Sequence, residues 1–121
     1  MRKVIIVQEG QWGIVTRENY DEFIKILKRI VENAVDGNKE RIAEVEVVET
    51  SAEALTRLEM KRIDTLIFIS RDMLAEAKKI KKVHHRLKVV LFTGLIPEEE
   101  VILVDKGWLF SSREIERIIL Y

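Results

Sequence analysis

The residues of this chain that could take part in chemistry are polar side chains that follow short apolar runs. They are Gln8, Glu9, Ser70, Thr93 and Lys106. Together they offer an amide, a carboxylate, two hydroxyls and an ammonium group, which suit the binding of a nucleotide or another anion. The set holds a single carboxylate, whereas a hard cation such as Mg²⁺ prefers several oxygen ligands. We therefore expect no metal and no cofactor, with a nucleotide-binding or anion-binding domain, or a small enzyme, as an alternative.

Nucleophilic catalysis is not indicated. Cysteine is absent, which excludes disulfides, thiolate nucleophiles and cysteine metal ligands. The two histidines, His84 and His85, are neighbours late in one predicted helix, so they form no catalytic triad with Ser70. Neighbouring helical positions project about 100° apart, which also disfavours a metal ion shared by the two imidazoles. We expect a protein without catalytic residues.

Four unbroken apolar tetrads predict the strands that would position these side chains. Each tetrad is rich in branched residues, as is typical of strands that are covered by helices on both faces of a parallel sheet. Residues 44–49 partly alternate between charged and apolar side chains and predict a more peripheral strand. The tetrads are residues 4–7, 66–69, 89–92 and 101–104.

Helical patterns separate the strands. From Asn19, the expected N-cap, apolar residues recur at three-and-four spacing as far as Val35. Thr50 and Ser70 have the type and position of N-caps for two further helices. The apolar stripe of the second of these continues to Leu87.

The order of elements predicts one α/β domain over residues 1–121. Strands alternate with helices, which favours right-handed crossovers and a mainly parallel, five-stranded sheet in a three-layer α/β/α arrangement. Only residues 93–100 separate the last two tetrads, fewer than a helical crossover usually takes. The last strand is therefore expected to follow an extended loop or to run antiparallel at an edge, before a last helix over residues 111–121.

Composition restricts the partners. Lys and Arg number 21, as do Asp and Glu, so no global field attracts nucleic acid or anionic lipid. Apolar runs are far shorter than the roughly 20 residues that span a bilayer, and the N-terminus lacks a signal-peptide core. We expect a cytoplasmic protein without a membrane partner. Charged residues make up 35% of the chain, a balance that resembles proteins of heat-loving organisms.

Over about three quarters of its length, the chain resembles a response-regulator receiver domain of the CheY-like family. This resemblance implies a flavodoxin-like or CheY-like sheet. The residues that carry it are Lys3-Val-Ile-Ile-Val7, Val48-Glu-Thr-Ser-Ala-Glu-Ala-Leu55, Asp64-Thr-Leu-Ile-Phe-Ile69 and Val89-Val-Leu-Phe-Thr-Gly94.

The receiver chemistry is incomplete in this chain. Where the family has an acidic pair after the first strand, this chain has Gln8 and Glu9, and Ser70 occupies the place of the phosphoacceptor aspartate. Thr93 and Lys106 match the family's hydroxyl and lysine, although a glycine replaces the proline that normally follows the lysine. The resemblance implies a receiver-like domain that is not phosphorylated and acts through protein contacts.

The same resemblance implies a docking face on the last helix and the strands beside it. A protein partner or a second copy of the chain is expected to bind there. The residues concerned are Trp108, Phe110, Ile115 and Ile119.

A weaker likeness points to the F subunit in the central stalk of archaeal and vacuolar-type ATPases. It is carried by residues 66–76. That family has a short turn after its first strand, where this chain inserts a long helical pattern.

The strongest charge cluster runs from Lys78 to Lys88. A basic helix can bind nucleic acid or an acidic protein, but no aromatic residues are interleaved here. The favoured interpretation is that these cations solvate the outer face of a helix and interact with the partial negative charge at its C-terminus.

Overall fold

The computed structural model describes residues 1–10, 17–92 and 102–104. Its strands are β1 (Arg2–Val7), β2 (Ala43–Val48), β3 (Thr65–Phe68), β4 (Lys88–Phe92) and β5 (Ile102–Val104). Its helices are α1 (Arg17–Asn33), α2 (Ser51–Met60), α3 (Leu74–Val83) and the single 3₁₀ turn η1 (Arg71–Met73). These elements alternate along the chain as the sequence predicts.

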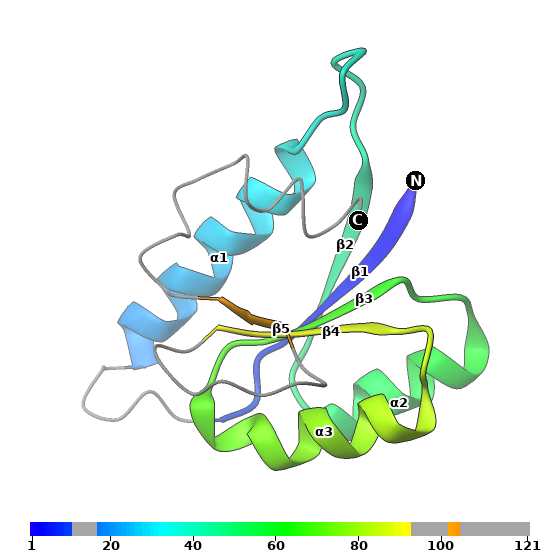
Figure 1. Cartoon of the computed structure of the whole chain (residues 1–121). Coiled ribbons are helices and arrows are strands. Elements are labelled where there is room, and N and C mark those ends of the chain that lie inside the picture. Colours follow the sequence, from blue (N-terminus) through cyan, green and yellow to red (C-terminus); the bar gives the residue numbers. More distant parts are fainter. Residues whose placement is uncertain (11–16, 93–101, 105–121) are drawn as a thin grey trace.

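The strands form a parallel sheet in the order β2-β1-β3-β4-β5 (Figure 1). In register, Val4 of β1 lies between Val45 of β2 and Thr65 of β3, and Thr65 in turn pairs with Lys88 of β4. An α/β fold with a parallel sheet is therefore confirmed. The strand predicted to be peripheral, β2, is an edge strand of this sheet.

The short last strand β5 is parallel to its neighbour. Leu91 of β4 pairs with Leu103 of β5. The antiparallel alternative for this strand is therefore wrong. Residues 93–101, which connect the two strands, lie outside the described part of the chain.

Two apolar clusters hold the helices against the two faces of the sheet. Alternate residues of a strand point to opposite faces, so Ile6 packs in the cluster beneath α1 and its neighbour Ile5 in the cluster beneath α2 and α3. Leu27 of α1 and Ile80 of α3 are the corresponding buried helix residues. Figure 1 shows α1 on one side of the sheet and the other two helices together on the opposite side.

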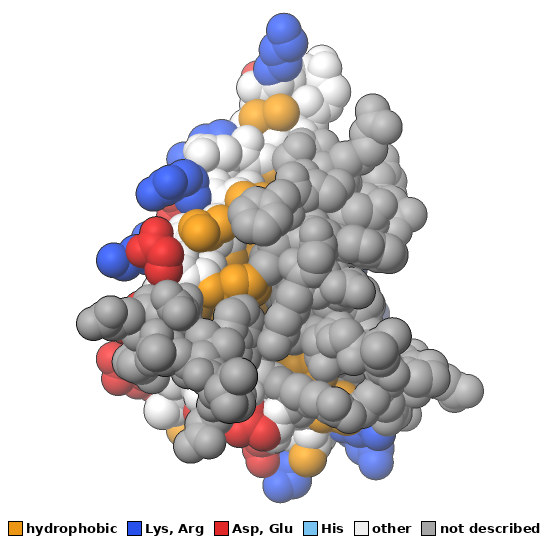
Figure 2. All heavy atoms as spheres, turned by 90° about the vertical axis from the view of Figure 1, so that its left-hand side faces the viewer, with side chains coloured by type: hydrophobic (Ala, Val, Ile, Leu, Met, Phe, Trp, Pro, Cys, Tyr) orange, Lys and Arg blue, Asp and Glu red, His pale blue; other side chains and the backbone are white. Residues whose placement is uncertain are grey.

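The surface on the α1 side carries charges of both signs. Figure 2 shows basic and acidic side chains distributed around this face, with apolar side chains between them. One described pair there is Lys28 with Glu32, whose charged atoms are 3.3 Å apart.

Two predicted N-caps differ in outcome. Thr50 caps α2 as expected, because its Oγ1 accepts a hydrogen bond of 3.2 Å from the amide of Glu53. Asn19 is not a cap, since α1 already begins at Arg17 and Asn19 lies within its first turn. Arginine and glutamate, at the two preceding positions, are good helix formers and extend the helix in that direction.

The third helix starts later and ends earlier than predicted. Ser70 does not cap α3, because the chain first forms η1, in which the Met73 amide donates to the Ser70 carbonyl. The helix ends at Val83, where the amide of His84 donates to the Ile80 carbonyl. Leu87 is buried as the apolar stripe predicts, but it belongs to the turn that leads into β4. Both histidines therefore lie outside the helix.

Within the described residues, the longest helix is too polar to serve as a membrane span, and no other helix qualifies.

Candidate functional site

The predicted rim lies at the carboxyl ends of β1 and β3. The structure brings Gln8, Glu9 and Ser70 close together there, and it adds Gly10 and Asp72. The other predicted residues lie outside the described part of the chain. These are Thr93 and Lys106 of the rim and Trp108, Phe110, Ile115 and Ile119 of the docking face.

Ser70 is enclosed at the centre of this rim. Its side chain is 0% exposed, and its hydroxyl forms a short hydrogen bond with the carboxylate of Asp72. Gly10, with φ of +116°, passes directly over it. A Cβ atom on Gly10 would come within 2.8 Å of both Ser70 Oγ and Asp72 Oδ1, which is closer than real Cβ contacts. The described residues thus leave the hydroxyl without room for a reactant.

The two residues after β1 are bound to helices. Glu9 Oε1 accepts a hydrogen bond of 2.8 Å from the amide of Ser51, the first residue of α2. A carboxylate at this position also interacts favourably with the partial positive charge of a helix N-terminus. Gln8 Nε2 donates to Asp21 Oδ1 of α1 at 2.9 Å. Both side chains join elements of the fold, which the sequence pattern alone does not reveal.

The rim offers a poor set of metal ligands. Among the residues for which the structure gives positions, no three His, Asp or Glu side chains are grouped closely enough to hold an ion. Glu9 and Asp72 each contribute one carboxylate, and both accept hydrogen bonds from the protein. The hydrogen bonds of these rim side chains stabilise the junctions of β1 and β3 with the helices that follow them.

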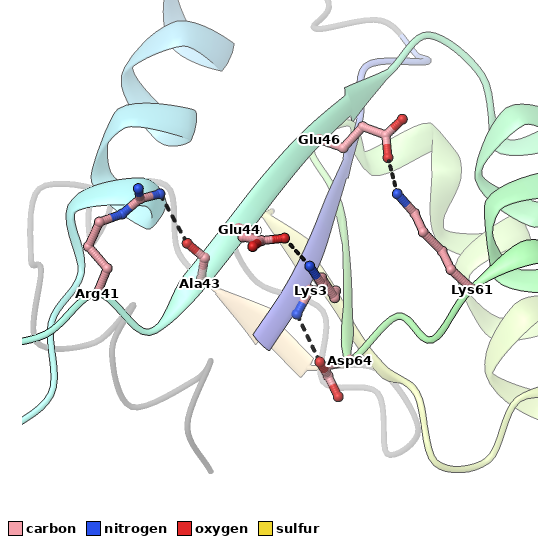
Figure 3. A network of polar contacts seen from close by, with 7 residues as sticks. All are labelled: Lys3, Arg41, Ala43, Glu44, Glu46, Lys61 and Asp64. Carbon is pink, nitrogen blue, oxygen red and sulfur yellow. Dashed lines mark hydrogen bonds and ion pairs between the residues drawn. The ribbon is translucent and has the colours of Figure 1, made fainter. Parts of the chain in front are cut away.

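Charged side chains gather at the opposite end of the sheet. Lys3 Nζ forms an ion pair with Glu44 across β1 and β2, and the Lys3 amide donates to Asp64 Oδ2 at 2.8 Å (Figure 3). Glu46 of β2 accepts from Arg57 at 2.8 Å and from Lys61 at 3.0 Å. These contacts join the first three strands to the end of α2.

Two pKa values are shifted at this end of the sheet. The hydrogen bond from Arg57, and then that from Lys61, hold the pKa of Glu46 below its usual value of 4.5. The pKa of Lys88, at the start of β4, is lowered mainly by burial and also by the positive charge of Arg2, while Asp64 opposes the shift. The amino end of the sheet is therefore an environment where positive charges already interact.

Two pockets that are lined by described residues open at this amino end. One, of about 680 Å³, lies between the turn from α2 to β3 and the turn from α3 to β4; we call it the basic pocket. A second pocket, of about 590 Å³, shares Lys61, Arg62 and Asp64 with it. The basic pocket is lined by Leu58, Lys61, Arg62, Ile63, Asp64, His84, His85, Arg86 and Leu87.

The basic run of the sequence is divided between three elements. Its first lysines lie on α3, His84, His85 and Arg86 lie in the turn, and Lys88 belongs to β4. The prediction of one basic helix is therefore wrong. The cluster of cations also includes Lys61 and Arg62 from the turn between α2 and β3, which lie outside this basic run of the sequence. The signal in the sequence was the position of two neighbouring basic residues, Lys61 and Arg62, directly after a predicted helix.

The fold defines the class as an α/β protein with a parallel sheet. No protein-family model, curated protein or solved structure matches this chain.

Proposed function

We propose that this chain is a non-catalytic, receiver-like regulatory domain that is not phosphorylated and acts through protein contacts, including self-association. The observation that carries the proposal is the enclosure of Ser70 at the end of β3. Its hydroxyl is fully buried, bonded to Asp72 and covered by Gly10. A regulatory domain with this rim would have to signal through its surface.

The strand order supports the receiver-like part of the proposal. The order β2-β1-β3-β4-β5 is that of flavodoxin-like sheets, to which CheY belongs. In that arrangement a phosphoacceptor is expected just beyond the end of β3, and here that place is taken by Ser70, which follows Ile69. A phosphoryl group carries a charge of about −1.5 to −2 at neutral pH, which a buried site without a cation would have to desolvate.

The acidic residue after β1 supports the same conclusion. Receivers use an acidic pair there to bind Mg²⁺, and this chain has a single carboxylate, on Glu9. That carboxylate accepts the amide of Ser51 at 2.8 Å. Binding a cation would compete with a hydrogen bond that caps α2.

The first test is chemical. The protein is incubated with Mg²⁺ and either acetyl phosphate or beryllofluoride, and its intact mass and backbone amide spectrum are recorded. We expect no added phosphoryl mass and no shifts for residues 8–10 or 70–72. A stoichiometric adduct would overturn the proposal. A rise in Tm with nucleotides would favour the alternative of a ligand-binding domain.

The second test addresses association. We expect Trp108→Glu or Phe110→Glu to abolish self-association in sedimentation velocity while the circular dichroism spectrum stays unchanged. Leu55→Glu, at a 36% exposed position on α2, is the matched control and should leave association intact. Loss of the folded state in the first two variants would show instead that these aromatic residues belong to the core. A wild-type protein that neither self-associates nor binds other proteins would contradict the interaction function itself.

The ATPase F-subunit alternative is not proposed. The resemblance requires a short turn after the first strand, and α1 extends over 17 residues at that place.

A further inference from the structure

The basic pocket carries an excess of positive charge in a chain whose formal charge is zero. Its lining includes three fixed positive charges, on Lys61, Arg62 and Arg86, and one negative charge, on Asp64. The two histidines of the chain also line it. The surface around the pocket is therefore selective for a partner of negative charge.

Hydrogen bonds hold the turn from α3 to β4 in place. Lys81 Nζ donates to the carbonyls of His85 at 2.9 Å and Leu87 at 2.6 Å. The amide of Leu87 donates to the His84 carbonyl at 3.1 Å, which closes the turn. A turn that is ordered in advance loses little conformational entropy when it binds.

The turn from α2 to β3 is equally constrained. The Lys61 amide donates to the Arg57 carbonyl at 3.0 Å, and Asp64 exchanges hydrogen bonds with the backbone of Lys3. The Lys88 amide donates to the Asp64 carbonyl at 3.1 Å and so connects the two turns. The basic pocket is consequently a preformed feature of the fold.

The positive charge is displayed at the outer edge of the pocket. The Arg62 side chain is 83% exposed, and its ion pair with Asp64, at 3.3 Å, is too exposed to be strong. His85 and Arg86 are exposed, and neither has an ion-pair partner among the residues that the structure describes. These three side chains are available to a partner at little cost.

Apolar side chains accompany the cations. Leu58 and Ile63 are partly buried against the core, and both line the pocket. Met60 is 74% exposed and Val83 is 73% exposed, and each directly precedes a lining residue. These are the two most exposed large apolar side chains among the described residues. A partner that matches this surface needs apolar as well as acidic groups.

The polarity of the two helices indicates which kind of anion the basic pocket can bind. Both α2 and α3 end at the pocket, and each helix C-terminus carries a partial negative charge of roughly 0.5. Together with Asp64, these ends oppose a phosphate group that enters deeply. An extended acidic chain can lie across the exposed tips of Arg62 and Arg86 instead.

Nucleic acid fits the same surface less well. Binding single strands relies on aromatic side chains for base stacking, and no described residue of the pocket lining is Phe, Tyr or Trp, the large rings that stack best. Exposed Met60 and Val83 would also have no role beside a phosphate backbone.

We infer that the basic pocket binds an acidic segment of a partner protein in which apolar side chains stand between the carboxylates. The inference rests on the proposed interaction function and names the class of partner and the surface that it uses. The residues named for this surface differ from those predicted for the docking face around Trp108.

A designed peptide provides the probe. We use a short fluorescein-labelled peptide rich in Asp and Glu, with leucine at every third or fourth position, and measure its binding by fluorescence anisotropy. Arg86→Glu reverses an exposed charge of the pocket. Arg29→Glu makes the same change at an exposed position of α1, the helix on the other face of the sheet from α2 and α3. Backbone amide shifts then locate the bound peptide.

We expect Arg86→Glu to weaken binding of this peptide at least about tenfold, because a like charge then faces the ligand. Arg29→Glu should leave the dissociation constant within about twofold of that of the wild type. Shifts should concentrate at residues 61–64 and 84–87. Replacing the leucines of the peptide by serine, or Val83 by serine, should weaken binding about threefold or more, because apolar contacts are lost.

Several outcomes would overturn the inference. They are absence of binding to the wild type, equal weakening by both arginine variants, tighter binding of an oligothymidine strand of equal charge, and displacement of the peptide by millimolar inorganic phosphate. The proposed function fails independently, through phosphorylation or through a wild type that neither self-associates nor binds other proteins. If the protein self-associates through Trp108 but does not bind the peptide, this inference is refuted while the proposed function still holds.

Discussion

Gly10 shows how one residue closes the predicted site. It has the only positive φ among the described glycines, and no side chain fits between it and Ser70. The loop after β1 can approach the end of β3 this closely because glycine lacks a Cβ atom. The close contact leaves the buried hydroxyl covered by the backbone.

A substitution at Gly10 tests this contact. Gly10→Ala should lower the free energy of unfolding by about 2 kcal/mol or more, because both the backbone angle and the space are unfavourable for alanine. Gly37→Ala is the control, since nothing lies within 4 Å of an added Cβ there. Urea denaturation measures both. Equal effects of the two variants would contradict the close contact.

Thr65 is a polar residue that is buried among apolar side chains. It is 1% exposed at the start of β3, and its hydroxyl finds no hydrogen-bond partner among the described residues. A buried hydroxyl without a partner costs free energy, whereas a methyl group of the same shape does not. Its side chain lies on the face of the sheet that packs beneath α1, as do Ile67 and Ile69.

Thr65→Val should therefore raise the free energy of unfolding by about 1 kcal/mol. Thermal and urea denaturation provide the measurement. Thr56→Val, at an exposed position of α2, is the control and should change stability by less than about 0.5 kcal/mol. Destabilisation by Thr65→Val would mean that the hydroxyl does have a hydrogen-bond partner.

At the scale of elements, β2 needs its charged residues because it is an edge strand. Glu44 and Glu46 extend from β2 and form ion pairs with Lys3 and Lys61, respectively (Figure 3). Glu46 forms a second ion pair with Arg57. Charges along an edge strand also discourage pairing with the edge of another sheet. The pairs of Glu46 join the edge of the sheet to the C-terminal end of α2.

The lowered pKa of Glu46 predicts a pH dependence. The folded state favours the ionised carboxylate, so this contribution is fully present above the usual pKa of 4.5 and is lost as the pH falls from there through the lowered value. Glu46→Gln should destabilise the protein by up to about 1 kcal/mol at pH 7, because the pair is about one third exposed. The difference from the wild type should shrink towards pH 3.

Urea denaturation at a series of pH values measures this difference. Glu49→Gln, at an exposed position just after β2, serves as the control, since the described residues provide no ion pair for it. A gap between wild type and Glu46→Gln that stays constant from pH 7 to pH 3 would show that the carboxylate charge does not matter.

At the scale of the whole molecule, the central strands connect the two apolar clusters. β1 contributes Ile6 to one cluster and Ile5 to the other, and β3 contributes Ile67 and Leu66 in the same way. Loss of packing on either face therefore disturbs the same strands. We expect the described part of the fold to unfold as one unit.

Two leucines test this cooperativity. Leu27 on α1 and Leu66 on β3 are both 0% exposed, in opposite clusters. Leu27→Ala and Leu66→Ala should each lower the free energy of unfolding by about 3 kcal/mol, and each should keep a single transition with an unchanged slope in urea. A separate early transition for Leu27→Ala would show that α1 unfolds independently.

Local patterns were sufficient for most of the elements. A strand that is covered on both faces needs apolar residues at every position, so β1, β3 and β4 could be recognised from their tetrads. The cap at Thr50 depends on residues only three positions apart, which also makes it visible in the sequence. The end of α3 could not be predicted, because Leu87 continues the apolar pattern while its backbone already leads into β4.

The sequence by itself determined the α/β class and the strand segments of the described sheet, because these depend on residue type and on spacing within one element. Only the tertiary structure decided that Glu9 caps α2, that Gly10 covers Ser70, and that the turns containing Lys61 and Arg86 line one pocket. Each of these contacts joins residues far apart in the chain. Strand order and register bring such residues together, and no local pattern contains that information.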